Sequence, residues 1–253
     1  KKSKKLVSQG AILSNSIEEL ISSVTVFITC LPSPNSVKNV LFNAIPFLNK
    51  DHLWIEMSTT DEEDMKMLSN LVFKRNAAAL EAPITGGQHR AASGNISILV
   101  AGSKKTFKRA FPILSCVGHQ ILHCGKIGNA STLKVVTNYL ASINLLAIGE
   151  ALMVCKKYGL DLKTAYNGIK ISSGNSFVHE TESQVILNGS YNINFTMDLV
   201  LKDTGLFDNL AKKLNATLEI SPKIVEIFKD GQKKYGSRAW SSMIVKRMED
   251  LNK

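Results

Sequence analysis

The sequence is poor in the residues from which metal sites and disulfide frameworks are built. Its 253 residues include four cysteines, none of them in a CxxC pair, whereas a structural zinc site needs four Cys or His ligands at regular spacing. The adjacent His123 and Cys124 are too small a signal to predict a ligand set. We therefore expect no bound metal, and we expect buried thiols in a protein of a reducing, cytoplasmic compartment.

Arginines and aromatic residues are also scarce, which bears on nucleic-acid binding. The formal net charge is +10, but the excess is almost entirely lysine scattered along the chain, with five arginines and 7% aromatic residues. A nucleic-acid interface combines a basic patch with side chains that contact the bases. The composition favours a solvated lysine surface and no nucleic-acid partner, while a charge of +10 leaves a general attraction to phosphate backbones as the alternative.

Long apolar runs are missing as well. The longest run, Tyr139 to Cys155, is interrupted by Asn144 and Glu150 and is shorter than the ~20 residues that cross a bilayer. The lysine cluster at the N-terminus is not followed by the apolar segment of a signal peptide. We expect a buried helix in this run and no membrane partner.

In the first half of the chain, short β-rich runs alternate with amphipathic helical patterns. The runs that predict strands are Val24–Leu31, Leu53–Met57, Ala79–Ile84, Ile96–Ala101 and Gln120–His123. The segments that predict helices are Ser36–Leu48, Thr60–Arg75 and Lys105–Leu114. Thr60 with Glu63 three residues later is a capping-box pattern, which predicts Thr60 as a helix cap. Such alternation is typical of an α/β domain with a mostly parallel sheet.

The second half has helical periodicity only. The predicted helices are Asn129–Tyr158, Leu162–Ile171, Met197–Leu214, Pro222–Lys234 and Ser241–Asn252. The pattern changes between Gly125 and Asn129, so we expect an α/β domain over residues 1–127 and an all-α domain over residues 128–253.

Three clusters have the composition of functional sites. In Glu81–Gly87 (EAPITGG), adjacent glycines and a threonine after a strand can present N–H and hydroxyl donors to an anion, although a plain tight turn has the same composition. The second cluster is Gly125–Asn138 (GKIGNASTLKVVTN). In Leu199–Leu206 (LVLKDTGL), a Lys–Asp pair is either a surface ion pair or a buried pair that must be satisfied.

Lys134 and Asn138 of the second cluster are four residues apart and share one helix face. Lys134 has apolar neighbours, and burial among them would lower its pKa because desolvation disfavours the charged form. Such a lysine is a candidate proton donor or acceptor near neutral pH, and the asparagine can orient a substrate hydroxyl. An ordinary solvated lysine is the alternative.

In their order and spacing these clusters resemble the β-hydroxyacid dehydrogenase family. The resemblance covers essentially the whole chain and rests on Cys30–Pro32 (CLP), Met57–Thr60 (MSTT), Ala82–Gly87 (APITGG), Ser93–Gly102 (SGNISILVAG), Gly125–Asn138 and Lys202–Asp203. One departure is Ala130, which stands where the family has a second glycine before the catalytic helix.

The resemblance implies a fold, a cofactor and a substrate class. The fold would be an incomplete Rossmann-type domain followed by an all-helical domain like that of 6-phosphogluconate dehydrogenase, which forms a dimer or tetramer. The cofactor would be NAD or NADP. The substrate would be a small β-hydroxyacid of the 3-hydroxyisobutyrate, glycerate/tartronate semialdehyde or threonate type.

The resemblance also implies roles for single residues. It places Lys134 in the catalytic position. The substrate-binding residues would be Thr85, Gly86, Gly87, Asn138, Asn175 and Ser176, and the loop with Asn175 is most similar to the threonate-type members. The cofactor-binding residues would be Leu31, Pro32, Thr59 and Lys202.

A second departure concerns the cofactor. The sequence has no GxGxxG turn, whose glycines and following helix bind the pyrophosphate, and Lys1–Lys5 resemble the segment just after the family's second strand. We therefore expect that the sequence comes from a gene fragment or an incomplete reading frame. The resulting protein should be inactive by itself and should bind dinucleotide poorly. The choice between NAD and NADP stays open, because the family makes it at the end of that second strand.

The predicted reaction is hydride transfer between a nicotinamide and the hydroxyl-bearing carbon of the substrate, with Lys134 taking or returning the hydroxyl proton. Two alternatives keep the fold. One is a non-catalytic binding protein of the same family. Some family members have lost the catalytic lysine, and the presence of Lys134 argues against this alternative. The other is the 6-phosphogluconate-type branch, which needs a phosphate-binding arginine in the helical half, where only Arg238 and Arg247 occur.

Overall fold

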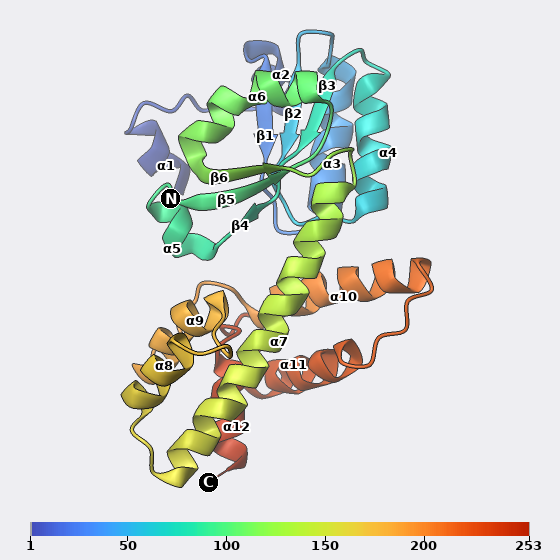
Figure 1. Ribbon diagram of the computed structural model, residues 1–253. Helices are drawn as coiled ribbons and strands as arrows, with labels where there is room; N and C mark the ends of the chain where they lie inside the picture. The colour runs from blue at the N-terminus through green and yellow to red at the C-terminus, as the bar shows by residue number, and fades with distance from the viewer. Residues whose placement is uncertain (1, 253) are drawn as a thin grey trace. The chain divides into compact units, whose positions relative to one another are not determined.

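The computed structural model describes residues 2–252 of the chain, which form two compact units (Figure 1). Among the described residues, unit 1 comprises residues 2–84 and Ser97–Ser131, and unit 2 comprises Thr85–Ile96 and residues 132–252. Up to residue 123 the elements are α1 (Lys2–Val7), α2 (Ile17–Ser23), β1 (Val26–Thr29), α3 (Pro34–Ala44), η1 (Ile45–Phe47), β2 (Leu53–Glu56), α4 (Glu62–Phe73), β3 (Ala78–Glu81), β4 (Ile84–Thr85), α5 (Gly87–Ala92), β5 (Ile96–Val100), α6 (Lys104–Val117) and β6 (Gly118–His123). The helices of the remaining chain are α7 (Asn129–Tyr158), α8 (Leu162–Lys170), α9 (Phe177–Leu187), α10 (Met197–Lys213), α11 (Ser221–Tyr235) and α12 (Met243–Leu251).

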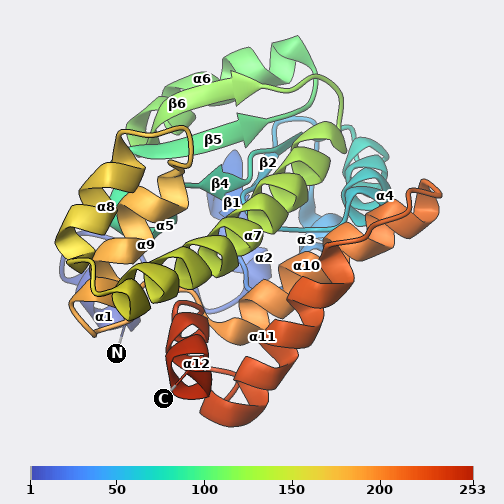
Figure 2. The same ribbon diagram turned by 60° about the horizontal axis from the view of Figure 1, so that its bottom comes forward.

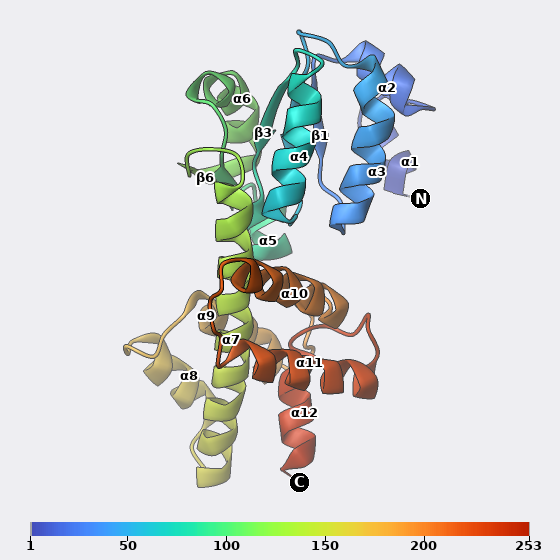
Figure 3. The ribbon, with the colours of Figure 1, turned by 90° about the vertical axis from the view of Figure 1, so that its right-hand side faces the viewer.

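Unit 1 is built on the parallel sheet β1-β2-β3, as the alternating pattern predicts. Phe27, Trp54 and Ala79 are neighbours in the strand register and therefore point to the same face. They pack against apolar side chains of α3 and α4 in one buried cluster. Figure 3 shows these two helices side by side along the sheet. Burial of this face is the main stabilising contribution in unit 1.

The predicted strand Ala79–Ile84 is wrong in its extent, because it divides into β3 and β4 at Pro83. Proline has no backbone N–H and cannot donate in a sheet, although its carbonyl accepts from the Leu99 N–H at 3.0 Å. After this break the chain enters a second three-stranded sheet, in the order β4-β5-β6.

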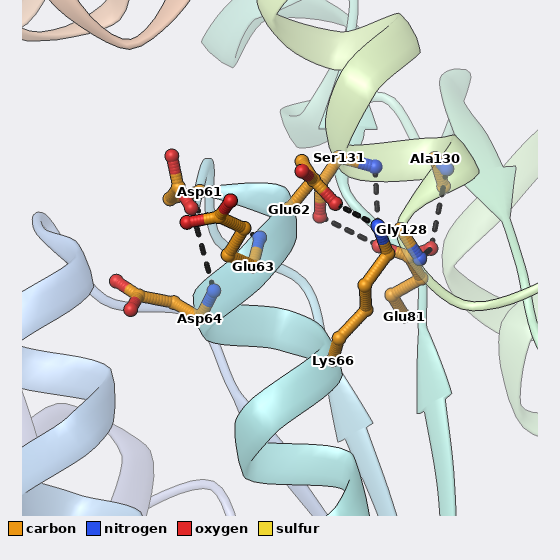
Figure 4. A network of polar contacts seen from close by, with 9 residues as sticks. All are labelled: Asp61, Glu62, Glu63, Asp64, Lys66, Glu81, Gly128, Ala130 and Ser131. Atoms are coloured by element: carbon orange, nitrogen blue, oxygen red, sulfur yellow. Dashed lines mark hydrogen bonds and ion pairs between the residues drawn. The ribbon is translucent and has the colours of Figure 1, made fainter. Parts of the chain in front are cut away.

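The start of α4 also differs from the prediction. The cap is Asp61, whose carboxylate accepts from the N–H groups of Glu63 at 2.9 Å and Asp64 at 3.4 Å (Figure 4). A carboxylate is favoured there by the helix dipole as well as by the free N–H groups. Thr60 is buried instead, with its hydroxyl 3.4 Å from Ser131 Oγ.

The prediction of buried cysteines is wrong too. Cys30 and Cys116 are exposed, and Cys124 and Cys155 are half-buried. Cys116 lies on α6 away from Ala110 and Leu114, the residues through which that helix is buried.

In unit 2, helix α7 lies between the pair α8–α9 and the helices α10–α12 (Figures 1 and 2). Its Leu145 and Leu146 belong to an apolar core that α9, α10, α11 and α12 complete. Gly149 allows α7 and α12 to approach closely, because a Cβ atom there would lie 2.9 Å from Met248 Sδ and from Val245 Cγ2.

The run Tyr139–Cys155, predicted as a buried helix, lies within α7 and is only partly buried within one chain. Helix α7 is long and apolar enough to cross a membrane by length and composition, and a third of its most apolar window (33%) is buried within the chain. Leu140 is 49% exposed and Val154 is 69% exposed. The helix thus covers part of the unit 2 core and leaves an apolar surface of its own.

The carboxylate of Glu81, the last residue of β3, binds the backbone at the start of α7. Glu81, fully buried at the end of β3, accepts the Gly128 N–H at 2.5 Å, the Ala130 N–H at 3.2 Å, and the Ser131 N–H and hydroxyl at 3.1 and 2.6 Å (Figure 4). Desolvation raises the pKa of Glu81, and these hydrogen bonds oppose the rise. The carboxylate satisfies N–H groups that have no partner within a helix.

We predict that Glu81→Gln destabilises unit 1 by about 1–3 kcal/mol, although glutamine has the same shape. The amide nitrogen would face hydrogen-bond donors where a carboxylate oxygen accepts them now. Urea unfolding followed by fluorescence of the buried Trp54, in a Trp240→Phe background, measures the change. Ser131→Ala removes one of the four donors and should cost less. Equal stability of the Glu81→Gln variant and the unsubstituted protein would contradict the prediction.

Candidate functional site

The predicted cofactor residues of unit 1 lie at the carboxyl end of the parallel sheet. Leu31 and Pro32 follow β1, and Thr59 follows β2. The Leu31 N–H donates to Ser58 Oγ at 2.8 Å, which ties the two loops together. Ligands of open α/β sheets bind at this edge. Leu31, Pro32 and Thr59 therefore lie at the edge where such sheets bind their ligands.

A buried network below these loops holds them in place. Glu56, 1% exposed, accepts the Ser58 N–H at 2.6 Å and the Thr29 hydroxyl. Thr29 in turn accepts from Trp54 Nε1 at 2.8 Å. Desolvation raises the pKa of Glu56, against the lowering effect of these hydrogen bonds.

In unit 2, Lys134 and Asn138 meet as their helical spacing predicts. Lys134 is buried, with 8% of its surface exposed, and its Nζ donates to Asn138 Oδ1 at 2.8 Å. The other end of that amide, Nδ2, donates to Asp203 Oδ2 at 2.5 Å. Asp203 lies on α10 and forms an ion pair with Lys202 Nζ at 2.8 Å. Four polar side chains from two helices thus form one connected chain.

The environment of Lys134 lowers its pKa to about 8. Desolvation by burial is the largest cause, the negative charge of Asp203 acts in the opposite direction, and the positive charge of Lys202 lowers the pKa further. A buried amine of this pKa can exchange a proton near neutral pH, which is what a general acid–base group requires.

The two predicted substrate loops come together within unit 2. Gly86 and Gly87 have φ angles of +121° and +78°, which favour glycine. Arg90, just beyond them, lies against Gly86 and places its guanidinium 4.4 Å from the ring centre of Phe177. Phe177 directly follows the other predicted loop residues, Asn175 and Ser176. The Arg90–Phe177 contact therefore links the Thr85–Gly87 loop to the start of α9.

The polar groups of the second loop are partly in use. Ser176 caps α9 by accepting the His179 N–H at 3.0 Å, and Asn175 Nδ2 donates to Glu180 Oε1 at 2.9 Å. The Asn175 Oδ1 atom is buried and has no hydrogen-bond partner among the described residues. Among the described residues, no hydrogen bond joins Lys134 to the Thr85–Gly87 loop or to the loop with Asn175 and Ser176.

Asp203 belongs to a cluster that the sequence singles out, but the sequence pattern does not show its contact with the site. The Lys–Asp pair of Leu199–Leu206 predicts either a surface or a satisfied buried ion pair, and the structure shows Asp203 3% exposed. Its second partner, Asn138, is 65 residues away in the sequence. Helical spacing cannot reveal that contact, and the apolar residues around the pair are its only signal.

Known proteins with similar sequences cover both halves of the chain. The model of the NAD-binding domain of 6-phosphogluconate dehydrogenase matches residues 1–125. The model for NAD-binding of NADP-dependent 3-hydroxyisobutyrate dehydrogenase matches residues 128–248. The two matches follow one another along the chain in the same order as the α/β and helical elements.

Single proteins that are similar to this chain are hydroxyacid dehydrogenases. 2-(Hydroxymethyl)glutarate dehydrogenase of Eubacterium barkeri is 27% identical over 250 residues, which cover 97% of this chain and 83% of the relative. L-Threonate dehydrogenase of Haemophilus influenzae is 28% identical over 189 residues, covering 74% of this chain and 63% of the relative. The crystal structure of 3-hydroxyisobutyrate dehydrogenase from Salmonella typhimurium superposes with a TM-score of 0.86 at 25% identity, over 96% of this chain and 86% of that one.

A Rossmann-like NAD-binding domain followed by a helical domain defines a class of dinucleotide-dependent oxidoreductases. Within that class, the chain belongs to the β-hydroxyacid dehydrogenase family, as the motifs imply. It is thus an oxidoreductase of hydroxyacids that uses NAD or NADP.

We predict that Lys134 titrates apart from the other lysines. With the lysine side chains labelled with ¹³C at Cε, one resonance should move with a midpoint near pH 8, while exposed lysines titrate near ~10.4. Lys134→Met should remove that resonance and identifies it. A Lys134 midpoint above pH 10 would show that burial does not perturb the amine.

Proposed function

We propose that the protein interconverts a small β-hydroxyacid and its oxo form, with Lys134 as the general acid–base. The substrate would be of the 3-hydroxyisobutyrate, glycerate/tartronate semialdehyde or threonate type, and the names of the relatives support that range. The observation that carries the proposal is the buried Lys134 amine, hydrogen-bonded to Asn138 and with its pKa lowered to about 8.

In the direction of oxidation, neutral Lys134 accepts the proton of the substrate hydroxyl, and in reduction the ammonium returns it. NAD or NADP, when bound, supplies the hydride acceptor or donor. Asn138 orients the hydroxyl next to Lys134. The Thr85–Gly87 loop holds the substrate carboxylate and thereby positions the reacting carbon. Asn175 and Ser176 contact the rest of the substrate. Leu31, Pro32, Thr59 and Lys202 bind the cofactor.

The state of Lys134 sets the expected pH dependence. Because oxidation needs the neutral amine, its rate should rise as the pH passes through about 8, and reduction, which needs the ammonium, should slow over the same range. The lowered pKa keeps both forms populated near neutral pH.

We predict that Lys134→Ala lowers the turnover number ~10²–10⁴-fold, the usual effect of losing a general acid–base group, while cofactor affinity is unchanged. Activity is measured on the chain as it stands and with the Gly-rich strand–turn–helix segment of a family member joined before Lys1. Lys157→Ala, at an exposed lysine in the last turn of the same helix, is the matched control. More than a tenth of the original turnover in the Lys134 variant would reject its assignment.

Two alternatives for the site are disfavoured by particular observations. A binding protein that has lost catalysis does not need a buried lysine with a pKa near 8. A 6-phosphogluconate-type enzyme needs a free arginine in the helical half, but Arg238 pairs with Asp198 at 3.2 Å and Arg247 pairs with Asp230 at 2.5 Å. Each guanidinium is thus already paired with a carboxylate, whose negative charge would repel a phosphate bound beside it.

We further propose that the protein is a homo-oligomer, a dimer or tetramer, whose subunits meet through the apolar surface of α7. The exposed Leu140 and Val154 support this, because a second copy would remove them from water. Helix α7 is long and apolar enough to cross a bilayer by length and composition. We nevertheless propose a cytoplasmic protein without membrane or nucleic-acid partners.

The oligomer proposal predicts a mass above the 27.7 kDa of one chain in light scattering at micromolar concentration. Leu140→Lys should shift the mass toward one chain, because a charge would be buried at the interface. Val117→Lys, on α6 in unit 1 and 41% exposed, is the matched control and should leave the mass unchanged. A mass near 27.7 kDa for the unsubstituted chain across a dilution series would refute the proposal.

A further inference from the structure

Asp203 is buried at the end of the polar chain that starts at Lys134. Its Oδ2 accepts from Asn138 Nδ2 at 2.5 Å, and its Oδ1 lies 2.8 Å from Lys202 Nζ. Asp203 and Lys134 do not contact each other directly in any described hydrogen bond, so the effect of one on the other passes through the Asn138 amide and through space.

The contact with Asp203 determines which way the Asn138 amide points. An amide has a donor end and an acceptor end, whereas an ionised carboxylate only accepts. The nitrogen of Asn138 must therefore face Asp203, and its oxygen must face Lys134, where it accepts from Nζ at 2.8 Å. The opposite orientation would place an oxygen against the carboxylate and a nitrogen against the ammonium.

The charges of α10 act on Lys134 in opposite senses. Asp203 is negative and favours the ammonium, while its neighbour Lys202 is positive and disfavours it. Among the described residues these are the charged groups that act on the Lys134 amine. Asp203 is buried, and the hydrogen bond from Asn138 Nδ2 keeps its charge at a fixed place relative to that amide. Its Oδ1 atom forms the ion pair with Lys202 but no hydrogen bond among the described residues.

We propose that Asp203 is a positioning residue of this enzyme, which orients the Asn138 amide so that its oxygen holds the Lys134 amine in place, and whose negative charge acts on that amine. The proposal rests on the proposed role of Lys134 as the general acid–base. The positive charge of Lys202 acts on the Lys134 amine in the opposite sense. The balance of the two charges therefore contributes to how readily the amine gains or loses a proton.

The test separates orientation from charge with two variants of Asp203. Asp203→Asn keeps an acceptor for the Asn138 amide but removes the negative charge, so the Lys134 midpoint in the ¹³C lysine titration should fall, with a modest loss of turnover. Asp203→Ala also removes the acceptor, so the midpoint should fall and turnover should drop at least ~10-fold more than in the asparagine variant, with a smaller change in KM.

Lys202→Gln is the matched variant of opposite sign. Loss of its positive charge should raise the Lys134 midpoint, whereas loss of the Asp203 charge lowers it. A residue that only stabilises the fold would lower the melting temperature without moving the midpoint in either direction. Unchanged midpoints in both the Asp203→Asn and the Lys202→Gln proteins, or equal turnover in the two Asp203 variants, would overturn the proposal.

The titration also distinguishes this inference from the proposed function. The midpoint of Lys134 is read from the spectrum of the protein without substrate or turnover. If Lys134→Ala leaves turnover intact, the general acid–base role fails, while shifts of opposite sign in the two variants would still show that Asp203 and Lys202 control the amine.

Discussion

An amine can remain inside a protein only if its lost hydration is replaced, and burying Lys134 imposes this requirement on the helices around it. Asn138 accepts its hydrogen bond, and Asp203 fixes Asn138. One residue further along α7, the Tyr139 ring stacks on Phe207 of α10, with centres 4.0 Å apart. The stack joins the same two helices beside the polar pair, so the packing of α7 on α10 and the state of the lysine depend on each other.

In unit 1, two buried carboxyl groups also need hydrogen bonds to replace the water that they have lost. Glu56 and Glu81 are neighbours in the register of β2 and β3, and both end their strands. Each is occupied by backbone N–H groups: Glu56 by the loop after β2, and Glu81 by the first turn of α7. Two adjacent buried carboxyl groups have the composition of an acid–base pair, yet here both accept hydrogen bonds from the backbone and thereby fix the loop after β2 and the start of α7.

The sequence predicts most of this fold, because its apolar runs and helical periods are strong. Helix α9 escapes prediction because His179 and Ser183, which hydrogen-bond to each other, occupy buried positions on it where apolar residues would show a period. The Lys134–Asn138 pair is predictable because it lies within one helix. The contact to Asp203 is tertiary, and local spacing carries no information on it. The roles of the loop residues come from family resemblance and not from physical chemistry.

The membership of Thr85–Ile96 in unit 2 matters for anyone who recombines such enzymes. The segment sits in the sequence between strands of unit 1, but it stacks against α9 through Arg90 and Phe177. A hybrid spliced at the change of pattern near Gly125 would take the helical half from one parent and this segment from the other. The exchange that preserves native packing is discontinuous and carries two pieces of chain at once.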